Sequence, residues 1–357
     1  MKATVVLLPG DGIGPEIVAQ GRRVLERVGE VFRHDFTFES YLVGGAALDA
    51  EGRPLSETTL QACQRADAIL LGAVGGPQWD DPTAPTRPED GLFALRAGLG
   101  LYANLRPVRA FPRLAEQSSP LRPERASNVD VLMVRELTGG IYFGEPRRRE
   151  IHNGERRALD TMVYTESEVR RVVRLAFELA RGRHRRVTSV DKANVLESSR
   201  LWRQVAEEVA AHYPDVRLEH QLVDSCAMRL VTGPGSFDVI VTSNLFGDIL
   251  SDEAAVITGS LGMLPSASLG DTPRGLYEPI HGSAPDIAGR GIANPLGTVL
   301  STAMLLRHSL QLTNEAEAVE TAVERAIAGG ARTADLGGGV SALGTSAMAD
   351  EVIARIG

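Results

Sequence analysis

The feature that most constrains the fold is an alternation of two hydrophobic periods along the chain. Short β-branched or aliphatic runs, typical of buried strands, are separated by longer stretches that repeat every ~3.6 residues, as helices do. The predicted strands are 4–8, 68–74, 129–134, 187–190 and 238–242. The predicted helices are 15–31, 166–181, 198–212, 245–257, 296–306, 316–327 and 346–356. This alternation predicts an α/β protein with a largely parallel sheet.

Length and charge narrow the class of protein further. A chain of 357 residues is long enough for two domains and a large core. Its formal charge of −8 argues against nucleic acid as the main partner, since phosphate binding requires a basic excess. No apolar run approaches the roughly 18 residues of a membrane span, and two distant cysteines suit a reducing compartment. We therefore expect a cytoplasmic protein with no membrane segment.

A glycine-rich turn follows the first predicted strand at residues 10–15. It resembles the dinucleotide-binding pattern G-x-G-x-x-G, but Pro15 stands where the third glycine is required. Proline is favoured in the first turn of a helix. The turn therefore indicates an entry into a helix, with a phosphate cradle as the alternative, and it argues against a Rossmann fold.

Two segments interrupt the alternation. Residues 76–90 are rich in proline and aspartate and predict a mobile loop at the rim of a site. Residues 141–165 contain two possible strands around the turn-forming pair Asn153-Gly154. The edges of such a hairpin would be exposed unless another subunit paired with them, so we expect a dimerisation arm.

Two aspartates follow the predicted strand 238–242. Asp248 and Asp252 are four residues apart, so they project from one face of the next helix, beside the strand end where α/β proteins bind ligands. Oxygen ligands without Cys or His suit Mg²⁺ or Mn²⁺ better than Zn²⁺. Asp224, after another strand-like run, is the candidate third ligand. The alternative is that the pair are solvated surface charges.

Lysine is rare in this chain, in which nearly every basic residue is Arg. The only lysines are Lys2 and Lys192, and Lys192 comes after the predicted strand 187–190. An ammonium loses its proton more readily than a guanidinium when it is buried or lies near other cations. A lone interior lysine therefore suggests proton transfer, whereas a salt bridge with Asp191 or Glu197 is the structural alternative.

Three arginines are candidates for carboxylate binding. They are Arg96, Arg106 and Arg135, of which Arg106 and Arg135 follow apolar strand-like runs. A guanidinium in such a position needs a carboxylate partner, which a substrate or Glu136 could supply. Tyr142, beyond two glycines, could donate a proton or simply pack.

The Gly- and Pro-rich segment 276–295 predicts a long ordered loop. Loops of this length within a compact domain are usually functional. In this loop, Asp286 could accept hydrogen bonds from ribose hydroxyls and would repel a 2′-phosphate.

Seven motifs, in order along nearly the whole chain, resemble the isocitrate and isopropylmalate dehydrogenase family. They are residues 8–16, 72–77, 104–107, 134–146, 191–196, 244–252 and 278–286. The resemblance implies that family's fold, with two α/β domains around a cleft, not a Rossmann fold, and a dimerisation arm at about 141–165. A cofactor-side domain would span 1–101 and 259–357, and a dimerisation and substrate domain would span 102–258.

The resemblance also implies an activity. A member with these residues would oxidise and decarboxylate 3-isopropylmalate to 4-methyl-2-oxopentanoate in leucine biosynthesis, with NAD and Mg²⁺ or Mn²⁺ as cofactors. It would be a homodimer with shared active sites, because Lys192 and Asp224 reach the site from the other subunit.

The site residues implied by the resemblance fall into four sets. Catalysis would depend on Lys192 as base, Tyr142 as proton donor, and Asp224. The metal ligands would be Asp224, Asp248 and Asp252. The substrate contacts would be Arg96, Arg106, Arg135, Asp224, Glu89, Leu92 and Val195. The cofactor contacts would be Gly76, Glu89, Asn194, Glu278, His281, Gly282, Ser283, Ala284, Pro285, Asp286, Ile287 and Asn294.

Specificity is expected from two places. Leu92, Phe93 and Val195 would offer an apolar wall to an isopropyl group, and Glu89 would repel a third carboxylate. The pair Asp286-Ile287, in place of the Lys-Tyr pair of NADP-dependent isocitrate enzymes, favours NAD. Two alternatives stay open, namely a D-malate or tartrate dehydrogenase of the same family and a catalytically silent, metal-binding regulatory subunit.

Overall fold

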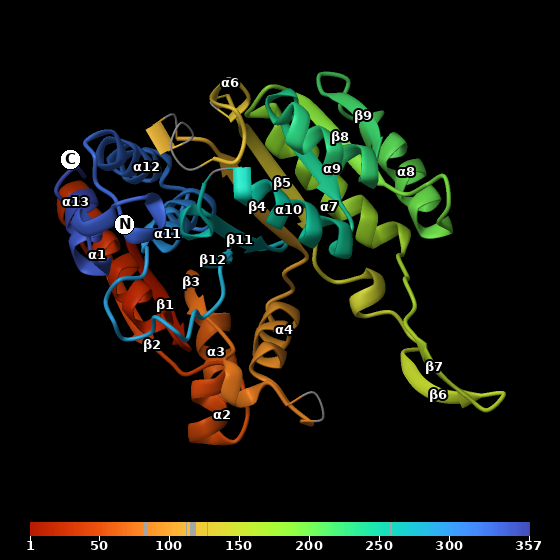
Figure 1. The fold of residues 1–357 in the computed structure, drawn as a ribbon, viewed down its shortest axis with the longest axis horizontal. Helices are drawn as coiled ribbons and strands as arrows, with labels where there is room; N and C mark the ends of the chain where they lie inside the picture. The colour runs from red at the N-terminus through yellow and green to blue at the C-terminus, as the bar shows by residue number, and fades with distance from the viewer. Residues whose placement is uncertain (82–83, 112, 115–118, 127, 258) are drawn as a thin grey trace. The chain divides into compact units, whose positions relative to one another are not determined.

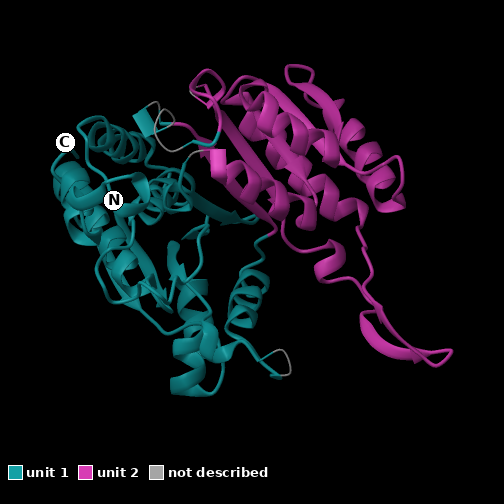
Figure 2. Cartoon of the chain, in the orientation of Figure 1, with its two compact units in different colours: residues 1–101, 111–120, 258–357 teal, residues 102–110, 121–257 magenta. Residues whose placement is uncertain are grey.

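The computed structural model describes residues 1–357 with the exception of 82–83, 112, 115–118, 127 and 258. The chain divides into two compact units (Figure 2). Unit 1 comprises residues 1–101, 111–120 and 258–357, and unit 2 comprises residues 102–110 and 121–257. Each unit combines a sheet with packed helices, as the alternating hydrophobic periods predict (Figure 1).

The sheet of unit 1 has the strand order β2-β1-β3-β12-β11. Its pairs β2–β1, β1–β3 and β3–β12 are parallel, whereas β12–β11 is antiparallel. The strands are β1 (Lys2–Gly10), β2 (Asp35–Ser40), β3 (Ala68–Ala73), β11 (Pro265–Leu269) and β12 (Leu276–Pro279). The middle of β1 and all of β3 are buried, which explains their continuous apolar runs in the sequence.

Helices cover both faces of this sheet. They are α1 (Gly14–Phe32), α2 (Gly45–Glu51), α3 (Glu57–Arg65), α4 (Pro88–Gly98), α11 (Leu296–His308), α12 (Thr313–Ala328) and α13 (Thr345–Ile353). Side chains alternate between the two faces of a strand. On β3, Ile69 packs in one core cluster with Cys63 of α3 and Leu95 of α4. Leu70 points the other way, toward Gly21 of α1.

The sheet of unit 2 has the strand order β4-β5-β10-β8-β9. Its pairs β5–β10, β10–β8 and β8–β9 are parallel, whereas β4–β5 is antiparallel. The strands are β4 (Ala103–Arg109), β5 (Asp130–Glu136), β8 (Arg186–Asp191), β9 (Arg217–Leu222) and β10 (Val239–Thr242).

The helices of unit 2 pack in two pairs, α7 with α8 and α9 with α10. They are α6 (Pro123–Ala126), α7 (Glu166–Arg181), α8 (Glu197–Ala210), α9 (Val223–Thr232) and α10 (Asn244–Ile257). The predicted capping box of α7 is present, because the side chains of Thr165 and Glu168 each accept from the other's backbone N–H. The predicted apolar stripe of α7, which includes Val172 and Phe177, is buried.

A hairpin of β6 (Arg148–His152) and β7 (Glu155–Leu159) projects from the rest of unit 2 (Figure 1). Its turn is the predicted pair Asn153-Gly154, and both residues have positive φ. β6 and β7 form a two-stranded sheet of their own among the described residues. Ile151, at 69% exposure, shows how little of the hairpin is covered.

Several elements were missed by the sequence analysis. They are β2, β11, β12, α2, α3, α4, α6 and α9, and β4 was recognised only as a strand-like run before Arg106. Most are short or polar: β2 alternates between exposed and half-buried residues, and α2 has only seven residues, too few for a periodic signal. The prediction of a largely parallel sheet is confirmed, and the pairs β4–β5 and β11–β12 are antiparallel exceptions.

The predicted loop 76–90 is also more structured than expected. It contains a short 3₁₀ helix, Pro77–Trp79, and the first residues of α4, which begins with a proline in its first turn. Its residues 82–83 lie outside the described residues. Among the residues that the structure describes, no helix combines the length and apolar character that crossing a bilayer requires.

Candidate active site

The candidate site of unit 2 begins with a cross-strand pair. In the antiparallel ladder β4–β5, Asn104 lies directly opposite Arg135, and Arg106 is two residues farther along β4. Residues opposite one another across a ladder, and residues two apart on one strand, project from the same face of a sheet. The side chains of Asn104, Arg106 and Arg135 therefore leave one face together, and all three residues are buried.

Helix α10 meets these arginines with one polar face. It begins directly after β10, which is a neighbour of β5. Asn244, Asp248, Ser251 and Asp252 follow the spacing i, i+4, i+7 and i+8, which aligns them along one side of a helix. The sheet and the helix thus bring a row of guanidiniums against a row of oxygen acceptors.

Two arginines and two aspartates form a hydrogen-bonded cluster. Nη1 of Arg106 donates to Asp252 Oδ1 (3.0 Å) and to Ser251 Oγ (2.6 Å). Nη2 of Arg106 lies 3.6 Å from Asp248 Oδ1, to which Arg135 donates from Nη1. The side chains of Asp248 and Asp252 remain 32% and 61% exposed. The cluster is charge-balanced and still accessible to a ligand.

An asparagine orients each of these two guanidiniums. Asn104 Oδ1 accepts from Arg106 Nε (2.7 Å), and Asn244 Oδ1 accepts from Nε (3.1 Å) and Nη2 (2.8 Å) of Arg135. A Cβ at Gly247 would lie 2.7 Å from Arg135 Cγ, so glycine is required where the arginine side chain crosses α10. The guanidiniums are therefore held in place by the protein itself.

Tyr142 joins the cluster from the turn after β5. Its hydroxyl donates to Asp248 Oδ2 (3.0 Å), and the Arg135 guanidinium carbon lies 5.9 Å from the ring centroid. Burial, followed by the charge of Asp248, raises the pKa of Tyr142 above its ordinary value. The phenol therefore stays protonated at neutral pH, as a proton donor must.

A buried carboxylate organises the turn that carries Tyr142. Glu136 accepts hydrogen bonds from the backbone N–H groups of Thr138 (2.7 Å) and Gly139 (2.8 Å), and it lies 3.9 Å from Nη2 of Arg171. Burial raises the pKa of Glu136, and these hydrogen bonds oppose the shift. Glu136 thus serves the turn and Arg171.

Lys192 and Asp224 form a separate ion pair in unit 2. Nζ of Lys192 lies 2.5 Å from Asp224 Oδ1, and this hydrogen bond lowers the pKa of Asp224. Lys192 follows β8 and Asp224 follows β9, so the parallel pairing of these strands brings the two together. The alternative partners of Lys192 pair elsewhere, Asp191 with Arg203 and Glu197 with Arg200.

The donor set fits a hard divalent cation, because accessible carboxylate oxygens are the ligands that Mg²⁺ and Mn²⁺ prefer. Asp248 and Asp252 supply two such groups on one helical face. Within the described ranges of a single chain, however, no group of three or more His, Cys, Asp or Glu residues could hold a metal ion. Asp224, paired with Lys192, does not complete the set in this chain.

In unit 1, Arg96 and Glu278 form a mostly buried ion pair between α4 and β12, with Nη2 of Arg96 2.7 Å from Oε1 of Glu278. Glu89, exposed at the start of α4, lies beside the turn after β3, since a Cβ at Gly75 would be 2.7 Å from its Oε1. Gly76 follows in the same turn. Helix α4 thus contacts both β12, through Arg96, and the turn after β3, through Glu89.

A residue that the sequence analysis did not single out, Asp11, connects this turn to the start of the chain. Its buried carboxylate accepts from the backbone N–H groups of Gly45 (2.8 Å), Ala46 (2.7 Å) and Gly75 (2.8 Å). Two of these amides open α2, where helical N–H groups lack partners of their own. The predicted entry into a helix is confirmed, because α1 begins at Gly14 with Pro15 in its first turn.

The predicted cofactor loop of unit 1 packs on the glycine turn. The Ser283 carbonyl accepts from Ile13 N–H (2.8 Å), and a Cβ at Gly12 would lie 2.0 Å from that carbonyl oxygen. Nδ1 of His281 bonds to the Gly282 carbonyl, whereas its Nε2 is buried with no hydrogen-bond partner among the described residues. Burial lowers the pKa of His281, so Nε2 is a neutral acceptor that a ligand could use.

The other predicted loop residues are placed differently. Asp286, like Gly282 and Pro285, is exposed, and Ala284 and Ile287 pack against Ile13 and Ile17. Asn294 is buried, and its side chain is committed to the fold: Nδ2 donates to Asp335 (3.0 Å), and Oδ1 accepts from Leu296 N–H at the start of α11 (3.0 Å).

The expected apolar wall is uneven in exposure. Leu92 is partly buried against the core under α4, whereas Phe93 is 43% exposed. In unit 2, Val195 is 62% exposed and Asn194 beside it is exposed as well. Exposed apolar side chains near a polar site are candidates for covering a ligand or a second chain.

Two α/β units, one with buried strand guanidiniums facing accessible carboxylates of α10, are an arrangement suited to an enzyme that binds small carboxylated molecules. The family model described as isocitrate/isopropylmalate dehydrogenase matches residues 4–352. The chain belongs to this family and is therefore an oxidoreductase.

Individual relatives agree with that assignment. Over the full length of both chains, the protein is 61% identical to an enzyme of Anaeromyxobacter dehalogenans named 3-isopropylmalate dehydrogenase. It is 56% identical to one of the same name from Bacillus subtilis, with 100% of this chain and 98% of the relative covered. Among solved structures, an isocitrate dehydrogenase from Methylococcus capsulatus matches with a TM-score of 0.87 at 35% identity, covering 99% of each chain.

Proposed function

We propose that the protein catalyses the NAD-dependent oxidation and decarboxylation of 3-isopropylmalate to 4-methyl-2-oxopentanoate, a reaction of leucine biosynthesis. The observation that carries the proposal is the unit 2 cluster of Arg106, Arg135, Tyr142, Asp248 and Asp252, in a chain so similar to enzymes of that name. A dicarboxylic 2-hydroxy acid has carboxylates that the guanidiniums can bind and a hydroxyl that a metal ion on the aspartates can bind.

Charge balance supports a dicarboxylate bound together with a divalent cation. The two guanidiniums and two carboxylates already neutralise one another. A divalent cation adds two positive charges and a substrate dianion adds two negative ones, so the loaded site would stay neutral. Arg106 and Arg135 would exchange an aspartate for a substrate carboxylate, in bidentate pairs. Arg96 of unit 1 belongs to the proposed substrate contacts as well.

The proposed metal ligands are Asp248 and Asp252 of one chain and Asp224 of the partner subunit. The bound ion would supply Lewis-acid stabilisation of negative charge on the substrate's 2-oxygen. Asp248 and Asp252 would also fix the substrate's position, because they share their oxygens with Arg106, Arg135 and Tyr142.

Lys192 and Tyr142 are the proposed proton-transfer groups. Nζ of Lys192, from the other subunit, would accept the 2-hydroxyl proton when its amine is neutral, a form that a guanidinium does not reach because it stays protonated. The 2-oxo group formed lies β to a carboxylate, which then leaves as carbon dioxide. The Tyr142 hydroxyl, kept protonated by its surroundings, would deliver a proton to C3.

NAD is the proposed acceptor of the hydride from C2, and unit 1 supplies most of its proposed contacts. His281 offers an unpaired Nε2, and Asp286 is exposed and available to ribose hydroxyls. The turn carrying Gly76 is tied down by Asp11 through Gly75. The remaining proposed contacts are Glu89, Asn194, Glu278, Gly282, Ser283, Ala284, Pro285, Ile287 and Asn294.

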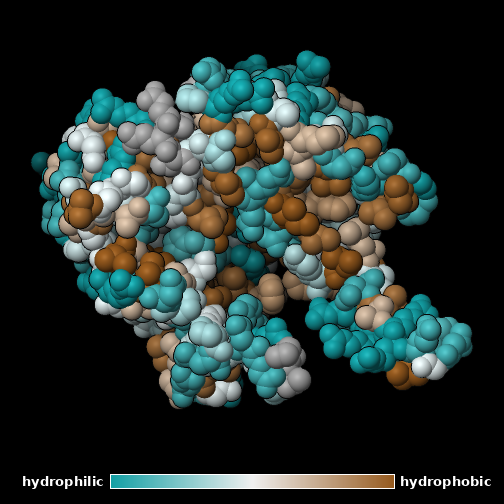
Figure 3. Space-filling view, in the orientation of Figure 1, coloured by the Kyte–Doolittle hydropathy of each residue, from teal (hydrophilic) through white to brown (hydrophobic). Residues whose placement is uncertain are grey.

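A homodimer with shared sites is part of the proposal. Large apolar side chains are exposed on α9 and α10, namely Met228, Val231, Ile249 and Val256. Figure 3 shows hydrophobic residues on the surface over these helices, whereas the hairpin is largely hydrophilic. Such a surface favours burial against a second chain, and the hairpin offers strand edges for pairing. Two buried, unbridged thiols, Cys63 and Cys226, support a cytoplasmic location.

A steady-state substrate panel tests the proposal. Purified protein with Mg²⁺ is assayed on 3-isopropylmalate, D-malate, tartrate and isocitrate, each with NAD and with NADP. The highest kcat/KM is expected for 3-isopropylmalate with NAD. A preference for D-malate or tartrate would replace the substrate, and inactivity on all four acids would favour a regulatory subunit.

A further inference from the structure

The side chain and the backbone N–H of Asn244 all form hydrogen bonds with residues in or beside the unit 2 cluster. It is the first residue of α10 and is 1% exposed. Its Oδ1 accepts two hydrogen bonds from the Arg135 guanidinium, and its Nδ2 donates to the Gly139 carbonyl (3.2 Å). Its backbone N–H donates to the Tyr164 hydroxyl (2.8 Å). A single side chain therefore connects Arg135 with the turn that precedes Tyr142.

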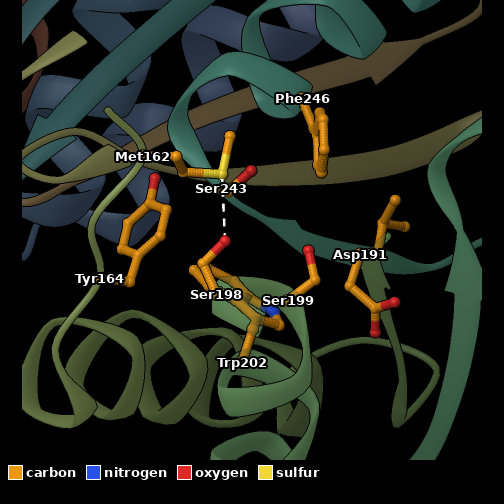
Figure 4. Close-up of a pocket in the computed structure, with 9 residues that line it drawn as sticks. Met162, Tyr164, Asp191, Ser198, Ser199, Trp202, Ser243 and Phe246 are labelled. Atoms are coloured by element: carbon orange, nitrogen blue, oxygen red, sulfur yellow. Dashed lines mark hydrogen bonds between the residues drawn. The ribbon is translucent and has the colours of Figure 1, made fainter. Parts of the chain in front are cut away.

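The turn that Asn244 contacts has little freedom to adjust. Gly139 and Gly140 lead directly into the 3₁₀ helix Gly140–Tyr142. Gly140 has a φ of +82°, and a Cβ there would lie 2.5 Å from the Tyr164 hydroxyl, so the turn packs closely on that ring. Figure 4 shows Tyr164, Met162, Ser243 and Trp202 around a small cavity. Ser243 is the residue that precedes Asn244 in the sequence.

Asn104 provides a natural comparison. Its Oδ1 accepts from Arg106 Nε, much as that of Asn244 accepts from Arg135, and it is equally buried. Asn104 lies on β4, opposite Arg135, whereas Asn244 reaches the glycine turn after β5. Both asparagines orient a guanidinium, and Asn244 also holds the glycine turn through the Gly139 carbonyl.

Building on the proposed function, we propose that Asn244 is a positioning residue that holds the Arg135 guanidinium and the Tyr142 hydroxyl in register. Arg135 fixes the substrate through a carboxylate, and Tyr142 must then meet C3 of the same molecule. A displacement of about 1 Å between such groups costs on the order of 100-fold in rate. The planar amide of Asn244 connects the Arg135 guanidinium with the Gly139 carbonyl, in the turn that carries Tyr142.

Substitutions at Asn244 separate its two tasks. In Asn244→Asp the acceptor for Arg135 remains, but the donor to the Gly139 carbonyl is replaced by an oxygen that repels it. In Asn244→Ser both contacts are lost. We expect Asn244→Asp to keep KM for 3-isopropylmalate within about threefold while kcat falls on the order of 10- to 100-fold. Asn244→Ser should raise KM in addition.

A double-mutant cycle with Tyr142→Phe identifies the route of the effect. If Asn244 acts through Tyr142, the kcat loss of Asn244→Asp should shrink to about twofold in the Tyr142→Phe background. Asn104→Ser is the matched control, and its effect, mainly on KM, should multiply with that of Tyr142→Phe.

Two results would overturn the inference, provided that the variants are folded and the wild-type protein turns over 3-isopropylmalate. One is an unchanged kcat in both Asn244 variants. The other is a kcat loss that multiplies fully with that of Tyr142→Phe. Wild-type protein that does not turn over 3-isopropylmalate would instead remove the proposed function, so the two failures are distinguishable.

Discussion

The proposed substrate site of unit 2 consists of charged side chains on β4, β5 and α10, whereas the proposed cofactor region of unit 1 is organised by contacts between the Asp11 carboxylate and backbone N–H groups. In unit 2, Arg106 and Arg135 meet Asp248 and Asp252 across a sheet and a helix. In unit 1, the Asp11 carboxylate accepts hydrogen bonds from three backbone N–H groups, two at the start of α2 and one in the turn after β3. We therefore expect substitutions in unit 2 to remove activity from a folded protein, and substitutions at the Asp11 hub to weaken the unit itself.

The largest effect is expected at the lone interior lysine. Lys192→Met should lower kcat by about 10²- to 10⁴-fold, because it removes the proposed base for the 2-hydroxyl proton. Substrate binding, measured by calorimetry with Mg²⁺ present, should persist. Lys2→Met, which changes the only other lysine, should leave kcat unaltered, and near-normal turnover by Lys192→Met would remove the proposed base.

Metal binding gives the next largest effect. Asp252→Asn should raise the Mg²⁺ concentration for half-maximal activity by about 10- to 100-fold, since a carboxylate ligand is lost. Glu253→Gln serves as the control, because it also removes one negative charge from α10 but lies one residue beyond Asp252, outside the polar face. An equal Mg²⁺ requirement in both variants would contradict the assignment of Asp252.

In unit 1 the expected effect is on stability. Asp11→Asn turns an NH₂ group toward backbone N–H groups, so unfolding free energy should fall by about 1–3 kcal/mol, and KM for NAD should rise. Asp67→Asn is the matched control, because Asp67 accepts one backbone N–H, from Thr4 (2.7 Å), at an exposed site. Thermal unfolding of both variants gives the comparison. Equal losses of unfolding free energy in the two variants would show that the three hydrogen bonds of Asp11 stabilise unit 1 no more than the single one of Asp67.

The sequence predicts the strand ends of unit 2 better than the turns of unit 1, for a physical reason. Asp248 and Asp252 follow a buried strand at helical spacing, and Lys192 is unique in composition, so their chemistry is visible locally. Asp11 and Asn244 lie within the family motifs 8–16 and 244–252, but they act through partners that are distant in sequence, so the motifs do not reveal their roles.

Short elements were missed for a similar reason. β4 was recognised only as an apolar run before Arg106, because the buried Arg106 and the half-buried Pro107 interrupt that run. Its antiparallel pairing with β5, which places Asn104 opposite Arg135, is a tertiary outcome. The resemblance to a known family supplied site residues that spacing alone could not.

The smallest predicted effect uses one thiol in each unit. Burial raises the pKa of both Cys63 and Cys226 to about 12, so neither is a thiolate at pH 8 and labelling should be slow in the native protein. Because these folded-state values lie above the ordinary 9.0, the thiols' contribution to stability is complete below pH 9 and is lost as pH rises toward 12.

Labelling of single-cysteine variants can then follow each unit. NAD at about ten times its Kd should slow labelling of Cys63 in unit 1 about tenfold if labelling requires that unit to open. Cys226 in unit 2 should respond mainly to Mg²⁺ with substrate. Identical protection of both thiols by every ligand would erase the distinction between the units.

Hybrid dimers test most directly the central claim that the Arg106, Arg135, Asp248 and Asp252 cluster of one chain works with Lys192 and Asp224 of another. Lys192→Met and Asp252→Asn proteins, each inactive alone at limiting Mg²⁺, are mixed in equal amounts and allowed to exchange subunits. Half of the dimers become hybrids with one intact site of two, so roughly a quarter of wild-type activity should return. Activity that stays at the level of the separate variants, after subunit exchange has been demonstrated, would contradict a site shared between subunits.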